Sequence, residues 1–202
     1  LEAYAKSQNR DFLRFDYQGH GASSGRFEAG SIASWLEDAL EAIDRLTAGP
    51  QVLIGSSMGG WIALLAARAR PQRTHAIVGV AAAPDFTETM RQGLDQAARA
   101  ALEAQGYFEQ PSDYSDEPYR ISKTLLEESR AHLLLSGPIA VDCPLRLLHG
   151  MQDEAVPWRT ALTIAAQASS QDVEVTLVKS GDHRLSSDAD LARLFQVIEA
   201  LP

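Results

Sequence analysis

The sequence predicts an α/β protein with a mostly parallel, doubly wound sheet. Short β-rich runs alternate with helical patterns along the chain, which is typical of βα units. One of these runs leads directly into a glycine- and serine-rich turn at 55–59 that is followed by a helix-forming segment. We expect five strands, at 11–15, 51–54, 75–80, 145–148 and 173–178.

The helices are predicted from apolar residues that recur on one face. The clearest is the segment after residue 31, where Ile32, Trp35 and Ile43 fall on one side and Glu37 and Asp44 on the other. Further helices are expected at 60–67, 161–168 and 190–201. Residues 1–6 resemble the end of a helix that is already under way.

Composition describes an ordinary globular domain. The chain has 202 residues, of which 45% are hydrophobic and 22% charged, enough apolar material for one substantial core. A net charge of −9 argues against nucleic acid as a partner. No apolar run approaches the ~20 residues of a membrane span. Without a targeting segment to read, we expect a cytoplasmic protein, and the sequence leaves the oligomeric state open.

The single cysteine and the absence of ligand clusters limit the chemistry. Cys143 has no partner for an internal disulfide, and we expect it to be a small buried residue at the start of a strand. No cluster with metal-ligand spacing surrounds it. The serine chemistry considered below implies no metal and no organic cofactor.

We treat residues 1–202 as one domain, with 83–139 as a cap insertion over the carboxyl edge of the sheet. This stretch is polar and helical, with a loop at 111–118. Long excursions of this kind often form active-site lids, and we expect 86–90 and 114–119 to face the substrate. The alternative is a solvated pair of helices without a lid function.

The motif Gly55-Ser56-Ser57-Met58-Gly59 has the pattern G-x-S-x-G between a strand and a helix, the setting of a nucleophile elbow. Ser57 is then the candidate nucleophile, on a strained turn where a Cβ at Gly55 or Gly59 would cause crowding. The helix that follows directs free N–H groups at developing negative charge. The alternative is a serine in an ordinary βα turn.

An activated serine needs a base, and the base needs an orienting acid. Asp153 follows the strand at 145–148, and His183 follows the strand at 173–178, so both are expected at the same sheet edge as Ser57. For the acid, Glu154 is the nearest substitute and Asp182 is a weaker one, because adjacent side chains seldom converge.

Other histidines fit the base less well. His149 comes too early in the order, and we expect it to close a strand by hydrogen bonding. His75 and His132 are poorly placed, whereas His20 lies in a glycine-rich loop and is a candidate to line the site.

These segments resemble the α/β-hydrolase superfamily, and within it the palmitoyl-protein thioesterase (mycophenolic acid acyl-glucuronide esterase) subgroup with its bacterial relatives. The likeness runs along the whole chain, is weakest in the cap, and rests on the segments 14–23, 49–61, 143–158 and 182–184. It implies Ser57 as nucleophile, Asp153 as acid and His183 as base. It also implies hydrolysis of small-molecule or acyl-protein esters or thioesters through an acyl-enzyme.

The resemblance further implies that three strands and an oxyanion-hole loop precede Leu1, so we expect the chain to be the N-terminally incomplete part of a longer protein. The Met58 N–H is then the oxyanion donor that the sequence contains. Met58, Trp61, Phe86 and Trp158 are candidates for an apolar acyl pocket, although each could instead be core packing.

Two other functions remain open. A peptidase or amidase on the same scaffold would need positioned protonation of an amine leaving group. A ligand-binding or scaffolding protein that retained the fold is the other, and the intact order of Ser57, Asp153 and His183 argues against it.

Overall fold

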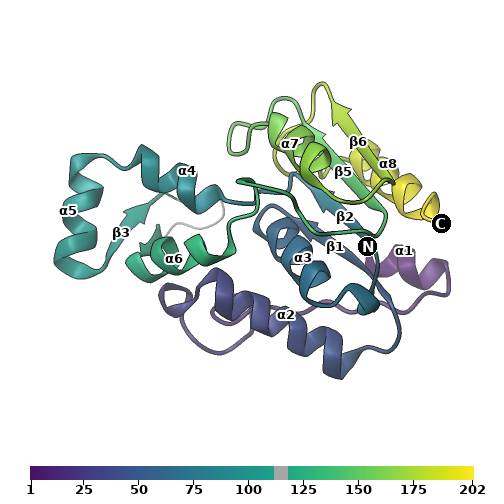
Figure 1. Cartoon of the computed structure of the whole chain (residues 1–202), viewed down its shortest axis with the longest axis horizontal. Helices are drawn as coiled ribbons and strands as arrows, with labels where there is room; N and C mark the ends of the chain where they lie inside the picture. Colours follow the sequence, from purple (N-terminus) through teal and green to yellow (C-terminus); the bar gives the residue numbers. More distant parts are fainter. Residues whose placement is uncertain (112–117) are drawn as a thin grey trace.

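The centre of the fold is a four-stranded parallel sheet. The computed structural model describes residues 1–111 and 118–202. The strands lie in the order β1-β2-β5-β6 (Figure 1). They are β1 (Gln51–Ser56), β2 (Thr74–Val80), β5 (Leu145–Gly150) and β6 (Val173–Val178). Four of the five predicted strands are therefore confirmed, along with the parallel α/β class.

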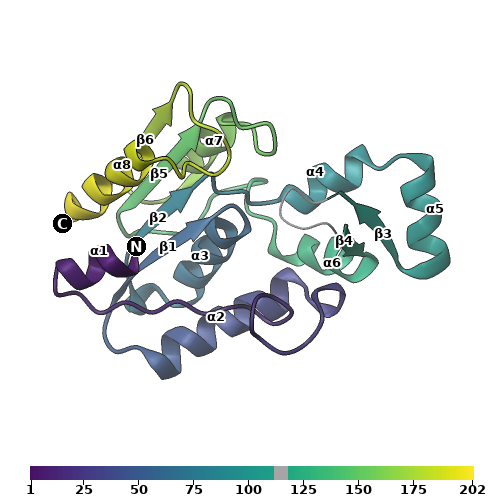
Figure 2. The same ribbon diagram turned by 180° about the vertical axis from the view of Figure 1, so that it is seen from behind.

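Helices cover both faces of the sheet, because alternate residues of a strand point to opposite sides. On β2, Ile77 joins one core cluster and Val78 joins the other. The first face carries α2 (Ile32–Leu46), α3 (Met58–Ala69) and α7 (Arg159–Gln167), and the second carries α1 (Glu2–Ser7) and α8 (Asp188–Glu199) (Figures 1 and 2). Two short 3₁₀ segments, η1 (Phe27–Ala29) and η2 (Pro71–Arg73), complete this part.

Helix α2 begins where its sequence provides a cap. The Ser31 hydroxyl accepts the Ser34 N–H at 3.3 Å, and the Ser34 hydroxyl accepts the Ser31 N–H at 2.9 Å. This reciprocal pair satisfies two backbone donors at the start of the helix. At 15 residues, α2 is the longest helix described, and in the described ranges no helix has the length and apolar character needed to cross a bilayer.

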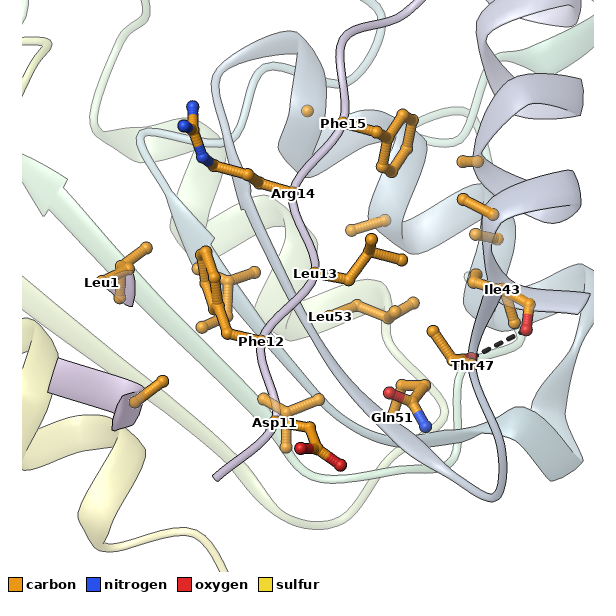
Figure 3. A pocket seen from close by; sticks show the side chains of 18 of the residues that line it. Leu1, Asp11, Phe12, Leu13, Arg14, Phe15, Ile43, Thr47, Gln51 and Leu53 are labelled. Carbon is orange, nitrogen blue, oxygen red and sulfur yellow. Dashed lines mark hydrogen bonds between the residues drawn. The ribbon is translucent and has the colours of Figure 1, made fainter. Parts of the chain in front are cut away.

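The predicted strand at 11–15 is wrong. The segment is extended beside β1, and its side chains alternate: Leu13 points toward Leu53, whereas Phe12 points away (Figure 3). It belongs to neither sheet in the described part of the chain. A cavity of about 710 Å³ borders both the segment and β1. Alternation in the sequence predicted an extended backbone, but a strand also needs a partner about 4.8 Å away, and this segment has none in the described sheets.

Between β2 and β5 the chain forms a lobe at one end of the molecule, which we call the cap (Figures 1 and 2). Its predicted helical character is confirmed by three α-helices among its described residues, but it also contains an antiparallel strand pair that the sequence did not reveal. Its elements are α4 (Phe86–Gly93), α5 (Gln96–Gln105), β3 (Tyr107–Gln110), β4 (Tyr119–Ser122), α6 (Lys123–Glu128) and η3 (Ser129–His132). Most of the predicted loop, residues 112–117, lies outside the described residues, and so does most of the predicted contact range 114–119.

Two contacts anchor the base of the cap. Asp85 stands at its first end with a positive φ of 63°. Its carboxylate accepts the N–H groups of Leu134 and Leu135 at the other end, both at 2.8 Å. The indole of Trp61 in α3 donates to the carbonyl of His132 at 3.0 Å. The two ends of the cap are therefore fixed to each other and to the helix that follows Ser57.

Candidate active site

Ser57 lies on the sharp turn between β1 and α3. Its φ of 51° and ψ of −120° are strained for a residue with a Cβ. Two hydrogen bonds to the end of β2 and the residues after it hold this conformation: the Ser57 N–H donates to Val80 at 2.9 Å, and the Ser57 carbonyl accepts from Ala83 at 3.0 Å. The predicted elbow geometry is present, and the central sheet fixes it.

The glycines around Ser57 have different purposes. A Cβ on Gly55 would lie 2.2 Å from the Gly59 carbonyl oxygen, so Gly55 is needed for the strand to turn into the helix. A Cβ on Gly59 would meet nothing within 4 Å, which corrects the expectation that both glycines of the motif relieve crowding. The second crowded position is Gly60, where a Cβ would lie 2.5 Å from the Ala82 side chain.

The three residues predicted to act together form one hydrogen-bonded series. His183 Nε2 lies 3.1 Å from Ser57 Oγ, and His183 Nδ1 lies 2.7 Å from Asp153 Oδ2. Because an ionised carboxylate can only accept, the network assigns the imidazole hydrogen to Nδ1 and leaves Nε2 free to accept the serine proton. This is the arrangement that base-assisted nucleophilic attack requires.

The loops that carry Asp153 and His183 are joined through their backbones. Met151 N–H donates to Val178 at 2.8 Å, and Gln152 N–H donates to Gly181 at 2.9 Å. A Cβ on Gly150 would lie 2.3 Å from the carbonyl oxygens of Gly181 and Asp182. Glycine at position 150 therefore lets the end of β5 approach the loop after β6 closely enough for the acid to reach the base.

The Asp153 carboxylate is the most enclosed group of the site, with a side chain that has no exposed surface. Its Oδ1 accepts the N–H groups of Ala155 at 2.9 Å and Val156 at 2.8 Å. Its Oδ2 contacts His149 Nε2 at 3.1 Å in addition to His183. His149 was not among the residues that the sequence predicted for the site. The spacing of four residues between a histidine at a strand end and a loop aspartate is the signal that could have indicated it.

The two alternative acids occupy other positions. Glu154 is exposed to solvent. Asp182 Oδ1 accepts the backbone N–H groups of Arg184 at 3.0 Å and Leu185 at 2.9 Å, so it shapes its own loop. Of the three candidates, Asp153 is the one within hydrogen-bonding distance of the His183 ring.

Met58 is the first residue of α3, and the first N–H groups of a helix have no intrahelical acceptor. Its N–H therefore belongs to the positive end of the helix dipole, next to Ser57. Negative charge that develops on an acyl carbonyl beside Ser57 Oγ would be stabilised at such a position.

The other candidate pocket residues do not form one group. Trp61 is fully buried, with its ring 5.7 Å from that of Phe86. This burial agrees with the alternative given for Trp61, core packing, here beneath the cap. The guanidinium of Arg159 covers the Trp158 ring, 4.4 Å from its centroid. His20 packs against an aromatic cluster, with its ring 5.1 Å from that of Trp35.

The 710 Å³ cavity lies beside β1 and α2, and its lining includes none of Ser57, Asp153 and His183. Cys143 is a poor competing nucleophile, because burial raises the pKa of its thiol and the nearby Asp142 carboxylate acts in the same direction. In the described part of the chain, no cluster of three or more His, Cys, Asp or Glu side chains could hold a metal ion.

Comparison with known sequences gives a consistent group of relatives. Residues 2–197 match a family model described as the alpha/beta hydrolase family. The chain is 44% identical over 202 residues to the mitochondrial palmitoyl-protein thioesterase ABHD10 of Bos taurus and 42% identical to the protein of that name in Homo sapiens. Both alignments include all of this chain, which spans 66% of the length of either relative.

Solved structures agree with this grouping. Alpha/beta hydrolase domain-containing protein 10 from mouse superposes with a TM-score of 0.90 at 42% identity, covering 99% of this chain and 80% of its own. A putative hydrolase from Agrobacterium vitis S4 superposes with a TM-score of 0.95 at 40% identity, covering 99% and 79%.

The comparisons also correct one expectation. A cytoplasmic location was predicted, but all five curated relatives carry the word mitochondrial in their names. The expectation rested on finding no targeting segment within residues 1–202, and these relatives extend beyond the region that this chain matches.

Proposed function

The chain belongs to the alpha/beta hydrolase family, and we propose that it is a serine hydrolase that cleaves thioesters or esters through an acyl-serine at Ser57. One observation carries the proposal: the hydrogen-bonded series from Ser57 through His183 to Asp153 at the carboxyl edge of the sheet. The same three residue types in this order recur in enzymes that transfer acyl groups to water.

In the first half of the reaction, Ser57 Oγ attacks the acyl carbonyl while His183 Nε2 takes its proton. Asp153 holds the imidazole in the required tautomer and stabilises the imidazolium that forms. The Met58 N–H donates to the tetrahedral oxyanion. Collapse of this intermediate breaks the bond to the leaving sulfur or oxygen, which receives the proton from His183.

In the second half, water attacks the acyl-serine and His183 accepts its proton. The carbon–oxygen bond to Ser57 breaks, and His183 returns the proton to the serine. The products are a carboxylic acid and the free enzyme. Every proton transfer passes through His183, so the proposed site needs no metal and no organic cofactor.

We assign thioesters as the first substrate class to test. The curated relatives are named palmitoyl-protein thioesterases. A thiol has a reference pKa of about 8.5, so it leaves with less help from an acid than an amine does. The alternative, amide hydrolysis, depends on accurate protonation of the departing nitrogen. We also propose that residues 1–202 belong to one hydrolase domain, with the cap between β2 and β5 contacting the acyl chain.

The test uses a matched panel and a covalent probe. The same acyl group is presented as a thioester, a p-nitrophenyl ester and an anilide, and a fluorophosphonate adduct is located by peptide mass mapping. We expect cleavage of the thioester and the ester, much slower cleavage of the anilide, and the adduct on Ser57. Failure to label Ser57, or cleavage of the anilide as fast as the thioester, would contradict the proposal.

A further inference from the structure

We infer that His149 is a positioning residue for the proposed reaction, which links the carboxylate of Asp153 to the central sheet and keeps it aligned with His183. The inference rests on the proposed function for its consequence in catalysis. Its structural half, the attachment of the acid loop to β5, can be tested without any substrate.

The contacts of His149 join a rigid element to a loop. His149 lies within β5, paired with Leu177 of β6, and its side chain is 1% exposed. Its Nε2 is 3.1 Å from Asp153 Oδ2 and 3.0 Å from the carbonyl oxygen of Val156. One ring nitrogen therefore reaches both the acid and the end of the turn that carries it.

These two partners fix where the ring hydrogen lies. The Val156 carbonyl and an ionised carboxylate both accept hydrogen bonds, and neither can donate one. His149 Nε2 therefore carries a hydrogen and donates it to both oxygens in a shared bond. Its role differs from that of His183, whose Nε2 must be free to accept from Ser57.

The arrangement gives Asp153 four donors. Two backbone N–H groups hold Oδ1, and the two histidines share Oδ2. The bonds to Ala155 and Val156 come from the loop itself, and the bond to His183 comes from a residue that gains and loses a proton in the proposed cycle. His149 is the donor that comes from a strand of the sheet and takes no part in the proton transfers. It therefore keeps Oδ2 in place while the charge on His183 changes.

The test compares two substitutions of His149 with a matched control. His149→Leu removes the donor and keeps the site filled, whereas the side-chain amide of His149→Gln can again donate toward Oδ2 and Val156. The control is His75→Leu. His75 is exposed, lies at the end of β2 away from the candidate active site, and has its Nε2 2.7 Å from the backbone oxygen of Pro202. This substitution also removes a contact between a histidine ring and a backbone oxygen.

For the best substrate of the panel, we expect His149→Leu to lower kcat by about 10- to 100-fold while KM stays within about 3-fold, because misalignment affects the transition state more than binding. His149→Gln should recover most of the loss, and His75→Leu should match the wild type. An unchanged kcat in His149→Leu would overturn the inference. So would equal losses in the leucine and glutamine variants, which would indicate a purely structural requirement for the imidazole.

Amide hydrogen exchange tests the structural half without any substrate, and it needs only that His149→Leu is folded, not that it is active. We expect exchange at Ala155 and Val156 to accelerate by about 10-fold in His149→Leu and by less than about 3-fold in His149→Gln. Unchanged exchange in the leucine variant would overturn the inference. If the wild-type protein hydrolyses nothing in the panel but exchange changes as expected, the proposed function fails while the attachment of the acid loop stands.

Discussion

The carboxyl edge of the sheet and the cap are held together in different ways. At the sheet edge, backbone hydrogen bonds and close glycine contacts fix the turn of Ser57 and join the loops of Asp153 and His183. The cap depends on side chains at its base, where Asp85 binds the backbone of Leu134 and Leu135 and Trp61 binds that of His132. Changes at the edge should therefore affect the chemistry, and changes in the cap should affect stability or selectivity.

The largest effect is expected from Ser57→Ala, which removes the nucleophile. Because the other members of the triad act only through Ser57, hydrolysis should fall by roughly 10⁴- to 10⁶-fold. The fold should survive, since the substitution removes a single hydroxyl. Ser56→Ala, at the exposed end of β1, is the matched control and should retain normal activity. The measurement is steady-state hydrolysis with circular dichroism as a check of folding, and residual activity above about a tenth would remove Ser57 from the mechanism.

Asp153→Asn should be the next most severe change. An amide can favour the wrong imidazole tautomer of His183, and the expected loss in kcat is up to about 10⁴-fold. Glu154→Gln makes the same kind of change one residue along, on an exposed side chain, and should be nearly neutral. If the Glu154 variant is inactive and the Asp153 variant is not, the acid has been assigned to the wrong residue.

Asp85→Ala tests the side-chain bonds that hold the two ends of the cap together. Two N–H groups at the end of the cap would lose their acceptor, so the free energy of unfolding should fall by about 2–4 kcal/mol. Asp85→Asn keeps one acceptor oxygen and tolerates the left-handed backbone, so its effect should be smaller. Denaturant titration supplies the free energies. Equal stability of the alanine variant and the wild type would show that the bonds of Asp85 to Leu134 and Leu135 contribute nothing to the free energy of unfolding.

Glu28→Gln provides a reference for the same region. Glu28 forms an ion pair with Arg120 of β4 at 3.5 Å, and the arginine side chain is 48% exposed. An exposed pair of this kind contributes about 0–1 kcal/mol, so its loss should be close to the limit of measurement.

Phe86→Ala should leave the rate of the chemistry nearly unchanged, and its effect should appear in selectivity. If the cap contacts the acyl chain, each methylene buried there is worth at most about 0.8 kcal/mol, or roughly 4-fold in relative kcat/KM. The ratio of long-chain to short-chain hydrolysis should change, while acetyl esters stay nearly unaffected. A series of p-nitrophenyl esters measures this ratio. A uniform loss at every length would mean that Phe86 supports the packing of Trp61 instead.

The sheet edge could be predicted from the sequence because its signals are local. A strand followed by a turn marks where Ser57, Asp153 and His183 stand, and parallel strands bring such turns to one edge. The features of the site that could not be predicted depend on contacts between residues from different parts of the fold or across a turn. Gly60 is constrained by Ala82, and His149 reaches across its own turn to Asp153, neither of which periodicity reveals.

The cap was less predictable for a related reason. The strands β3 and β4 are short and mostly polar, and Phe108 opposite Ile121 is the buried apolar pair that joins them. One such pair leaves no alternation to detect. The segment 11–15 has the alternation of a strand, yet it joins no sheet in the described structure, because a pattern specifies the faces of a strand and not its neighbour.

The bonds of Asp85 to Leu134 and Leu135 mark a junction at which the cap could be exchanged. A single side chain joins the points where the chain leaves the sheet region and where it returns. Lobes from related proteins could be grafted at this junction as cassettes, with the nucleophile turn and the two joined loops left untouched. A successful graft would need to keep the Trp61 indole covered and supplied with a carbonyl acceptor, as His132 does now. Evolution could exchange lobes at this junction in the same way, changing what is bound while the reaction stays the same.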